Sequence, residues 1–220
     1  MTPDGQKAAG HTGPGRKIIA AIPCFNEERF IGTVVLKAKK YVDGVVVIDD
    51  GSSDATAEVA AEAGAVVYKH GENRGYGAGI RSALQKGEEL GADVLVILDG
   101  DGQHDPRDIP RIVQPVLGDE ADIVVGSRFL GATGKKPPLY RHLGQRFLTT
   151  ATNLGSGHSV SDSQSGFRAY PSKALRELTL VEEGMAVSSE MQFAISKAGL
   201  RVAEVPIKVS YMGSAKRSPV

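Results

Sequence analysis

Three acidic residues lie within the stretch LDGDGQHDP, residues 98–106, where an apolar run ends. Asp99 and Asp101 offer carboxylate oxygens, and Gln103 offers a neutral amide oxygen two residues further on. Such oxygens suit a hard cation such as Mg²⁺ or Mn²⁺, which usually takes one or two carboxylates and completes its shell with water and substrate phosphate. The stretch therefore predicts a metal ion that Asp99, Asp101 and Gln103 hold against a diphosphate.

Two other interpretations of this stretch have to be weighed. A calcium-binding EF-hand loop needs glycine at its sixth position and glutamate at its twelfth, but counting from Asp99 these are His104 and Pro110. A structural calcium loop is therefore excluded, whereas an exposed acidic turn without a ligand stays open. Asp105 followed by Pro106 is typical of a helix start. His104 has no assigned role.

Short apolar runs alternate with helical stretches along the first part of the chain. The runs span residues 17–24, 44–50, 65–70, 93–101 and 121–129, and the helical stretches span 26–41, 53–64, 75–91 and 106–119. Apolar runs without polar alternation are typical of strands buried on both faces, and their alternation with helices predicts a parallel sheet. We expect an α/β fold, Rossmann-like and doubly wound, with a mostly parallel sheet and helices on both faces. A helix and a strand close the chain at 188–199 and 201–211.

Polar clusters follow three of the predicted strands, in PCFNEE, DDGSSD and DGDGQHD. In such sheets ligands bind outside the carboxyl ends of the strands. Any one cluster is also explained by helix capping, and SSDATAEVA is a good helix start by that criterion. Three clusters on one edge favour a binding site.

The glycines of NRGYGAG, residues 73–79, do not form a dinucleotide fingerprint. Their spacing departs from G-x-G-x-x-G, and they follow the third strand rather than the first. Nicotinamide chemistry is therefore disfavoured. We expect these glycines to let a helix N-terminus approach a neighbouring backbone or a phosphate.

The charges balance overall but are unevenly placed. The 26 Lys and Arg residues equal the 26 Asp and Glu residues, which argues against nucleic-acid binding by the whole surface. No acidic residue occurs between Ile123 and Ser161, and the basic residues of that interval are Arg128, Lys135, Lys136, Arg141 and Arg146. Apolar residues recur near helical spacing at Leu139, Leu143, Phe147 and Leu154. They suit a core helix equally well as a helix at an anionic membrane surface.

The remaining composition sets outer limits. Cys24 is the single cysteine, so no intrachain disulfide forms and a reducing cytosol is the natural compartment. No run approaches the roughly 18–20 apolar residues that span a bilayer. We expect a disordered tail at 1–16, one domain at 17–212 that includes a basic acceptor or membrane-surface segment at 129–157, and a basic tail at 213–220.

Taken together, PCFNEE, VIDDGSSD, LDGDGQHDP, VGSRF and DSQSGFR resemble, in this order and over residues 17–211, the inverting glycosyltransferases of family 2. The sequence GSRF, the basic segment and SGFR are most similar to polyisoprenyl-phosphate sugar transferases of the dolichol-phosphate mannosyltransferase type. The resemblance implies a GT-A-type fold and an enzyme that uses a UDP- or GDP-hexose, Mg²⁺ or Mn²⁺, and a polyisoprenyl phosphate. It also implies a cytoplasmic protein, peripheral at the cytoplasmic face of the membrane.

The resemblance implies roles for individual residues. Those on the donor-nucleotide side are Pro23, Phe25, Glu27, Asp49, Asp50, Ser52 and Asp99. The metal ligands are Asp99, Asp101 and Gln103, and the catalytic residues are Asp101, Arg128 and Arg141. The acceptor side comprises Arg128, Arg141, Asp162 and Glu190. For Arg168 in SGFR, a surface ion pair is the simpler interpretation.

The chemistry of the acceptor separates the alternatives. A hydroxyl acceptor needs a carboxylate base, for which Asp162 or Glu190 is the candidate, whereas a lipid phosphate is already an anion and is its own nucleophile. Its difficulty is repulsion from the donor diphosphate, which arginine side chains and a metal offset. The acid-free basic segment favours the phosphate. A nucleotide-binding regulator without turnover is the alternative from another class. The sequence leaves UDP-glucose, UDP-N-acetylglucosamine and GDP-mannose open as donors.

Overall fold

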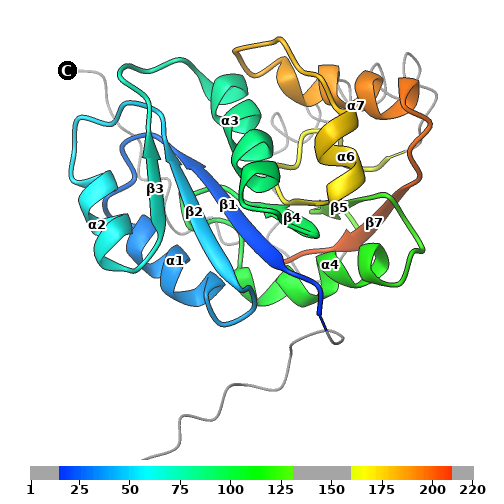
Figure 1. The fold of residues 1–220 in the computed structure, drawn as a ribbon, viewed down its shortest axis with the longest axis horizontal. Helices are drawn as coiled ribbons and strands as arrows, with labels where there is room; N and C mark the ends of the chain where they lie inside the picture. The colour runs from blue at the N-terminus through cyan, green and yellow to red at the C-terminus, as the bar shows by residue number, and fades with distance from the viewer. Residues whose placement is uncertain (1–14, 131–159, 210–220) are drawn as a thin grey trace, which may run out of the picture.

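The protein is described by a computed structural model that covers residues 15–130 and 160–209. These residues contain a seven-stranded sheet with the strand order β3-β2-β1-β4-β6-β5-β7 (Figure 1). The strands are β1 Ile18–Cys24, β2 Gly44–Asp49, β3 Val66–Lys69, β4 Val94–Ile97, β5 Ile123–Ser127, β6 Arg168–Pro171 and β7 Val202–Pro206. The helices are α1 Ile31–Ala38, α2 Thr56–Glu62, α3 Tyr76–Glu89, the 3₁₀ helix η1 Pro106–Asp108, α4 Ile109–Leu117, α6 Ser172–Glu177 and α7 Val187–Lys197.

The sheet is mostly parallel, which confirms the predicted fold class. Strands β1, β2, β3 and β4 pair in parallel, as do β5 and β7. The exception is β6, which runs antiparallel between β4 and β5. The sequence analysis missed β6, because this strand has only four residues, begins with the charged Arg168 and follows a polar stretch.

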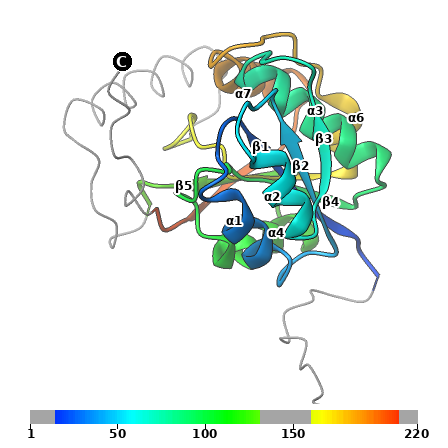
Figure 2. The same ribbon diagram turned by 90° about the vertical axis from the view of Figure 1, so that its left-hand side faces the viewer.

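The core consists of two hydrophobic layers, one on each face of the sheet. Side chains alternate along β1, so Ile18, Ala20 and Ile22 pack with helices α1 and α4, whereas Ile19 and Ala21 pack on the face of α3, α6 and α7. Figure 2 shows these two groups of helices on opposite sides of the sheet. Full burial of one such aliphatic side chain contributes about 1.5–3 kcal/mol. Packing on both faces therefore fixes the centre of the sheet and leaves the strand ends for polar residues.

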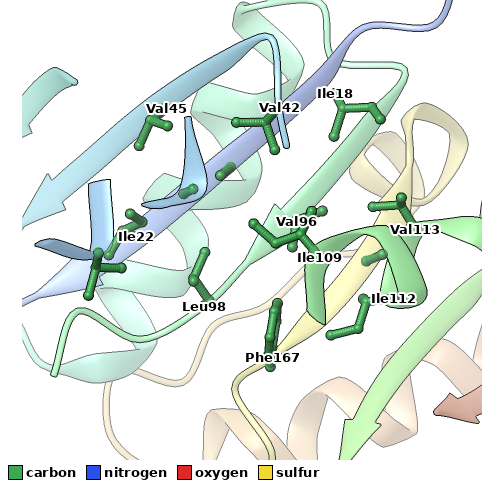
Figure 3. Close-up of a cluster of buried hydrophobic side chains, with 14 of the residues drawn as sticks. Ile18, Ile22, Val42, Val45, Val96, Leu98, Ile109, Ile112, Val113 and Phe167 are labelled. Atoms are coloured by element: carbon green, nitrogen blue, oxygen red, sulfur yellow. The ribbon is translucent and has the colours of Figure 1, made fainter. Parts of the chain in front are cut away.

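The layer beneath α4 is shown in Figure 3. The labelled side chains come from the central strands, from α4 and from the loops beside the strands: Ile18, Ile22, Val42, Val45, Val96, Leu98, Ile109, Ile112, Val113 and Phe167. Phe167 is fully buried here, directly before β6. Phe167, which follows the polar stretch 161–166, is thus anchored in the core. This fixes the point at which the chain enters β6 from that stretch.

Two details differ from the sequence-based expectations. Strand β3 is not buried on both faces, because it is the edge strand, and Val66 is 62% exposed. The helix predicted from residue 26 begins only at Ile31. Asn26 adopts a left-handed backbone conformation with φ 54°, and its N–H donates to Ser52 Oγ at 2.8 Å. Residues 26–30 therefore form a loop that is tied to the loop after β2.

The strand register brings the polar clusters together, as predicted. Cys24 lies opposite Asp49, and Ala21 lies opposite Ile97, so the loops after β1, β2 and β4 leave the same edge of the sheet. Asp105 caps η1, because its carboxylate accepts from the Arg107 N–H, and this confirms the predicted helix start. The carboxyl edge of the sheet is therefore where a site has to be sought.

Candidate active site

A cavity of about 620 Å³ opens at this edge of the sheet. Its volume is in the range of small-molecule sites. The predicted site residues that line it are Pro23, Phe25, Glu27, Asp50, Asp99, Asp101, Gln103 and Arg128. They come from the ends of β1, β2, β4 and β5, which are distant in sequence. The fold therefore gathers most of the predicted donor residues, all three predicted metal ligands and, from the acceptor side, Arg128 around one cavity.

The two carboxylates of the D-x-D sequence are held by different neighbours. Asp101 Oδ1 accepts from the Gln103 backbone N–H at 2.9 Å, and Asp101 Oδ2 accepts from the Gln103 side-chain amide at 2.6 Å. Asp99 Oδ1 accepts from the Tyr76 hydroxyl at 3.3 Å. Burial raises the pKa of Asp101, and the Asp99 carboxylate adds to the rise, whereas the bonds from Gln103 oppose it. A cation between the two carboxylates would offset their repulsion.

The donor set fits Mg²⁺ or Mn²⁺ only together with a phosphate-bearing ligand. No group of three or more His, Cys, Asp or Glu side chains within residues 15–130 and 160–209 is placed to hold a metal. Two carboxylates and one amide are nevertheless what a hard cation needs when it also binds diphosphate oxygens. Asp99, Asp101 and Gln103 therefore fit a metal that also binds the oxygens of a phosphate-bearing ligand.

His104, which had no assigned role, lies beneath Asp99. Its ring is 5% exposed and packs against Phe167, with the ring centroids 5.3 Å apart. Its Nδ1 atom is 3.5 Å from Asp99 Oδ2 and has no hydrogen-bond partner among the residues that the structure describes. His104 thus forms the buried floor behind the D-x-D carboxylate and does not line the cavity.

Arg128 and Asp162 form a bidentate ion pair. Arg128 Nε and a terminal nitrogen each donate to an Asp162 oxygen at 2.7 Å, and the Arg128 backbone N–H donates to Asp162 Oδ2 at 3.1 Å. Asp162 is fully buried, whereas the Arg128 side chain is 18% exposed and lines the cavity. The Asp162 N–H donates in turn to Glu204 of β7 at 3.1 Å. Asp162 therefore fixes the orientation of the Arg128 side chain, and Arg128 lies between Asp162 and the cavity.

Glu190, expected on the acceptor side, holds backbone instead. Its two carboxylate oxygens accept from the N–H groups of Val181 and Glu182, at 2.8 and 3.0 Å. Arg81 of α3 donates to the carbonyl oxygens of the same two residues, at 2.8 and 2.5 Å. Glu190 does not line the cavity. It helps to fix the segment that precedes α7.

Asp49 and Ser52, expected to contact the nucleotide, shape the loop after β2. Asp49 is fully buried and accepts from the Ser52 N–H at 3.0 Å. Neither residue is among those lining the cavity, whereas Asp50 between them is. Arg141, together with residues 131–157 of the predicted basic segment, lies outside the described residues. Its role and that of the segment stay predictions, as do the domain limits.

Arg168 is not in a surface ion pair, contrary to expectation. It is 2% exposed, and it donates to the carbonyl oxygens of Ser163 and Ser165 at 2.5 and 2.8 Å. A guanidinium has five N–H donors and suits this task of holding a turn from beneath. Arg168 therefore fixes the loop that carries Asp162 and the cavity-lining Gln164.

Sequence reasoning missed several residues of the cavity wall. They are Asn73, Gly75, Tyr76, Gly79, Gln164, Met185 and Ser188, besides Cys24 and Gly100. The approach of the glycines to a neighbouring backbone was predicted and is confirmed, because the Gly77 N–H donates to the Glu183 carbonyl at 2.8 Å. Tyr76 lies in the sequence NRGYGAG and Gln164 in DSQSGFR, so a sequence motif pointed to the region of each residue. No sequence motif pointed to Met185, because only tertiary contacts bring its loop to the cavity.

No helix of the described residues is long and apolar enough to cross a membrane.

Comparisons with known proteins agree with this geometry. The sequence matches the family described as glycosyl transferase family 2 over residues 19–179. It is 35% identical over 215 residues to the UDP-N-acetylglucosamine–dolichyl-phosphate N-acetylglucosaminyltransferase of Methanococcus voltae, covering 88% of this chain and 86% of that one. It is 30% identical over 202 residues to the undecaprenyl-phosphate mannosyltransferase of Micrococcus luteus, covering 87% and 82%.

Among solved structures, the fold is similar to glucosyl-3-phosphoglycerate synthase from Mycobacterium tuberculosis, in a complex with Mg²⁺ and uridine diphosphate. The TM-score is 0.71 at 26% identity, and the match covers 89% of this chain and 70% of that one. Since the family match spans most of the chain and the cavity holds the D-x-D carboxylates, the chain is a glycosyltransferase of the GT-A fold and belongs to glycosyltransferase family 2.

Proposed function

We propose that the protein transfers a hexose from a nucleotide-diphosphate sugar to a polyisoprenyl phosphate, with inversion at the anomeric carbon. An oxygen of the lipid phosphate forms the new bond to the anomeric carbon. The bond from that carbon to the diphosphate breaks, and its electron pair leaves with the nucleoside diphosphate. The attacking oxygen carries no proton that has to be removed, so the reaction needs alignment and charge compensation rather than a base.

The observation that carries this proposal is the state of the two candidate bases. Asp162 has both oxygens bound to Arg128, and Glu190 has both oxygens bound to backbone N–H groups. Neither carboxylate lines the cavity, whereas the Arg128 cation does. This arrangement favours an anionic acceptor over a hydroxyl. The names of the two relatives, which act on dolichyl and undecaprenyl phosphates, support the same acceptor class.

The donor-side residues form two groups, one that would bind the metal and diphosphate and one that would contact the nucleoside. Asp99, Asp101 and Gln103 would hold Mg²⁺ or Mn²⁺, which when bound would neutralise the diphosphate leaving group. The solved relative with Mg²⁺ and uridine diphosphate supports this assignment. Asp50 and Glu27 lie on the cavity wall nearer β1 and β2, where acceptor oxygens suit N–H or hydroxyl groups of a nucleoside. Both UDP- and GDP-hexoses satisfy this description.

The test is a donor and acceptor screen. Purified protein is incubated with UDP-glucose, UDP-N-acetylglucosamine or GDP-mannose, each with a short polyprenyl phosphate and with Mg²⁺, Mn²⁺ or EDTA. The matched control acceptor is the polyprenol without its phosphate. We expect one donor to give a glycosyl-phosphoryl lipid, seen by mass spectrometry, only with phosphate and metal. Equal transfer to the polyprenol would contradict the proposed acceptor, and full activity in EDTA would contradict the proposed requirement for a metal ion.

Gly166 offers a test of the D-x-D geometry. A Cβ atom at this position would lie 2.7 and 2.8 Å from the two Asp99 oxygens and 2.7 Å from the Tyr76 hydroxyl. Gly166→Ala should therefore displace Asp99 and lower kcat by about 10²-fold, which is the usual effect of misplacing a catalytic group by about 1 Å. The control is Gly184→Ala, whose added methyl group meets no atom within 4 Å. If both variants retained the wild-type rate, the geometry of Asp99 would not matter.

A further inference from the structure

The proposed reaction does not use His70, yet this side chain is buried in a defined hydrogen-bonded chain. It follows β3 and is 5% exposed. Its Nδ1 atom lies 2.6 Å from Asp50 Oδ1, and its Nε2 atom lies 2.9 Å from Ser82 Oγ on α3. A buried imidazole bonded at both nitrogens has one orientation, and so does the carboxylate attached to it.

Of the three hydrogen-bonded residues Asp50, His70 and Ser82, only Asp50 lines the cavity. Its Oδ1 atom also accepts from the Arg74 N–H at 3.0 Å, and its Oδ2 atom accepts from the Gly75 N–H at 2.8 Å. A carboxylate has about four acceptor positions. Protein groups occupy two on Oδ1 and one on Oδ2, so the acceptor position left over belongs to Oδ2.

Asp50, His70 and Ser82 have the connectivity of a nucleophilic triad, but Ser82 is not placed to act as one. It lies inside helix α3, where the backbone N–H groups are bonded within the helix and cannot form an oxyanion site. It is also not among the residues that line the cavity. The series of hydrogen bonds therefore links Ser82 in helix α3 through His70 to Asp50, and Asp50 is the residue that can contact a ligand.

We propose that His70 is a positioning residue for the donor nucleotide, which it affects only through Asp50. The Nδ1–H group of His70 occupies one side of Asp50 and turns Oδ2 toward an N–H group of the nucleotide. The Ser82 hydroxyl, which donates or accepts equally well, keeps the ring in its plane. This inference rests on the proposed function, because it presupposes a nucleotide in the cavity.

Two substitutions separate the two nitrogens of the ring. In His70→Asn the side-chain amide nitrogen takes the place of Nδ1, so the donor to Asp50 is kept and the bond to Ser82 is lost. In His70→Gln the amide reaches toward Ser82, and no donor remains at the Nδ1 position. His70→Ala removes both bonds without a new polar group and serves if the glutamine variant does not fold. Ser82→Ala cuts only the outer bond.

The measurement is calorimetric binding of UDP and of GDP in the presence of Mn²⁺, with thermal unfolding as the check on folding. We expect His70→Gln and His70→Ala to weaken binding of the preferred nucleotide about ten-fold or more, as for a lost bond to a charged group. His70→Asn and Ser82→Ala should stay within about three-fold of wild type. In the transfer reaction, the KM for the donor should rise while the KM for the lipid phosphate does not.

The outcomes distinguish this inference from the function on which it rests. If wild-type protein binds neither nucleotide, the proposed function itself is contradicted. If wild-type protein binds but folded His70→Gln or His70→Ala binds equally well, only the role of His70 is overturned. It is also overturned if folded His70→Asn loses as much affinity as they do, since the Nδ1–H donor would then not be what matters.

Discussion

Asp101→Asn should lower the rate of sugar transfer by about 10²- to 10³-fold, the usual loss when one group that stabilises developing charge is removed. Asparagine keeps the size of the side chain and one oxygen that accepts from the Gln103 backbone N–H, and the Gln103 side-chain amide can turn its oxygen toward the new NH₂ group. What disappears is one negative charge next to Asp99, which we propose to be needed for binding a metal and a diphosphate. Mn²⁺ affinity, measured by electron paramagnetic resonance with UDP or GDP present, should fall together with the rate.

The control for this variant is Asp105→Asn in the same loop. Asp105 caps η1 and binds Arg107, and it is not among the residues lining the cavity. This substitution should leave the rate of transfer within about two-fold, because asparagine caps a helix about as well as aspartate and the side chain lies away from the cavity. If Asp101→Asn kept the activity and Mn²⁺ affinity of the control, the D-x-D carboxylates would have no part in metal binding.

The second large effect is expected at Arg128, where stability and catalysis have to be separated. Arg128→Ala alone leaves the buried Asp162 carboxylate without its partner, which typically costs about 3–5 kcal/mol. Arg128→Ala combined with Asp162→Asn removes the unpaired charge and should recover much of that stability. Both variants should lose about 10²- to 10³-fold in kcat/KM for the lipid phosphate, because they lack the cation that we propose to face the acceptor.

The comparison that decides this assignment is between acceptor and donor. In the double variant, the Kd for the nucleoside diphosphate should stay within about three-fold of wild type, since the D-x-D residues are untouched. Chemical denaturation of the single and double variants gives the stability difference, and steady-state kinetics with varied lipid phosphate gives the acceptor effect. A double variant that lost donor binding and acceptor use to the same extent would show that Arg128 does not belong to the acceptor side.

Much of the fold was predictable because its signals are local. Uninterrupted apolar runs such as IIAAIPC and VLVI predict buried strands, and polar residues after them predict the edge at which ligands bind. The D-x-D sequence and Gln103 were predictable for the same reason, since one short loop holds them all. Asp105 and Pro106 could be separated from the site, because they form a helix start.

The rest depended on pairings between distant residues. Strand β6 inserts between β4 and β5, and nothing in RAYP indicates a partner more than 40 residues earlier in the chain. Glu190 has the residue type of a base, but the Val181 and Glu182 N–H groups that occupy it are visible only in the folded chain. His70 looked like the end of a strand, and its link to Asp50 exists because β2 and β3 are neighbours.

The contact between Glu204 and the loop of Asp162 has a consequence for how the enzyme matures on the ribosome. The Ser161 and Asp162 N–H groups are held by a carboxylate more than 40 residues further along, on the strand that pairs with β5. Strands β1, β2, β3 and β4, by contrast, are contiguous in the chain and emerge early. A nascent chain therefore contains the D-x-D residues before β7 has emerged, although a domain generally folds as a unit. The Arg128 cation, which we propose to face the acceptor, is aligned only after β7 has been translated.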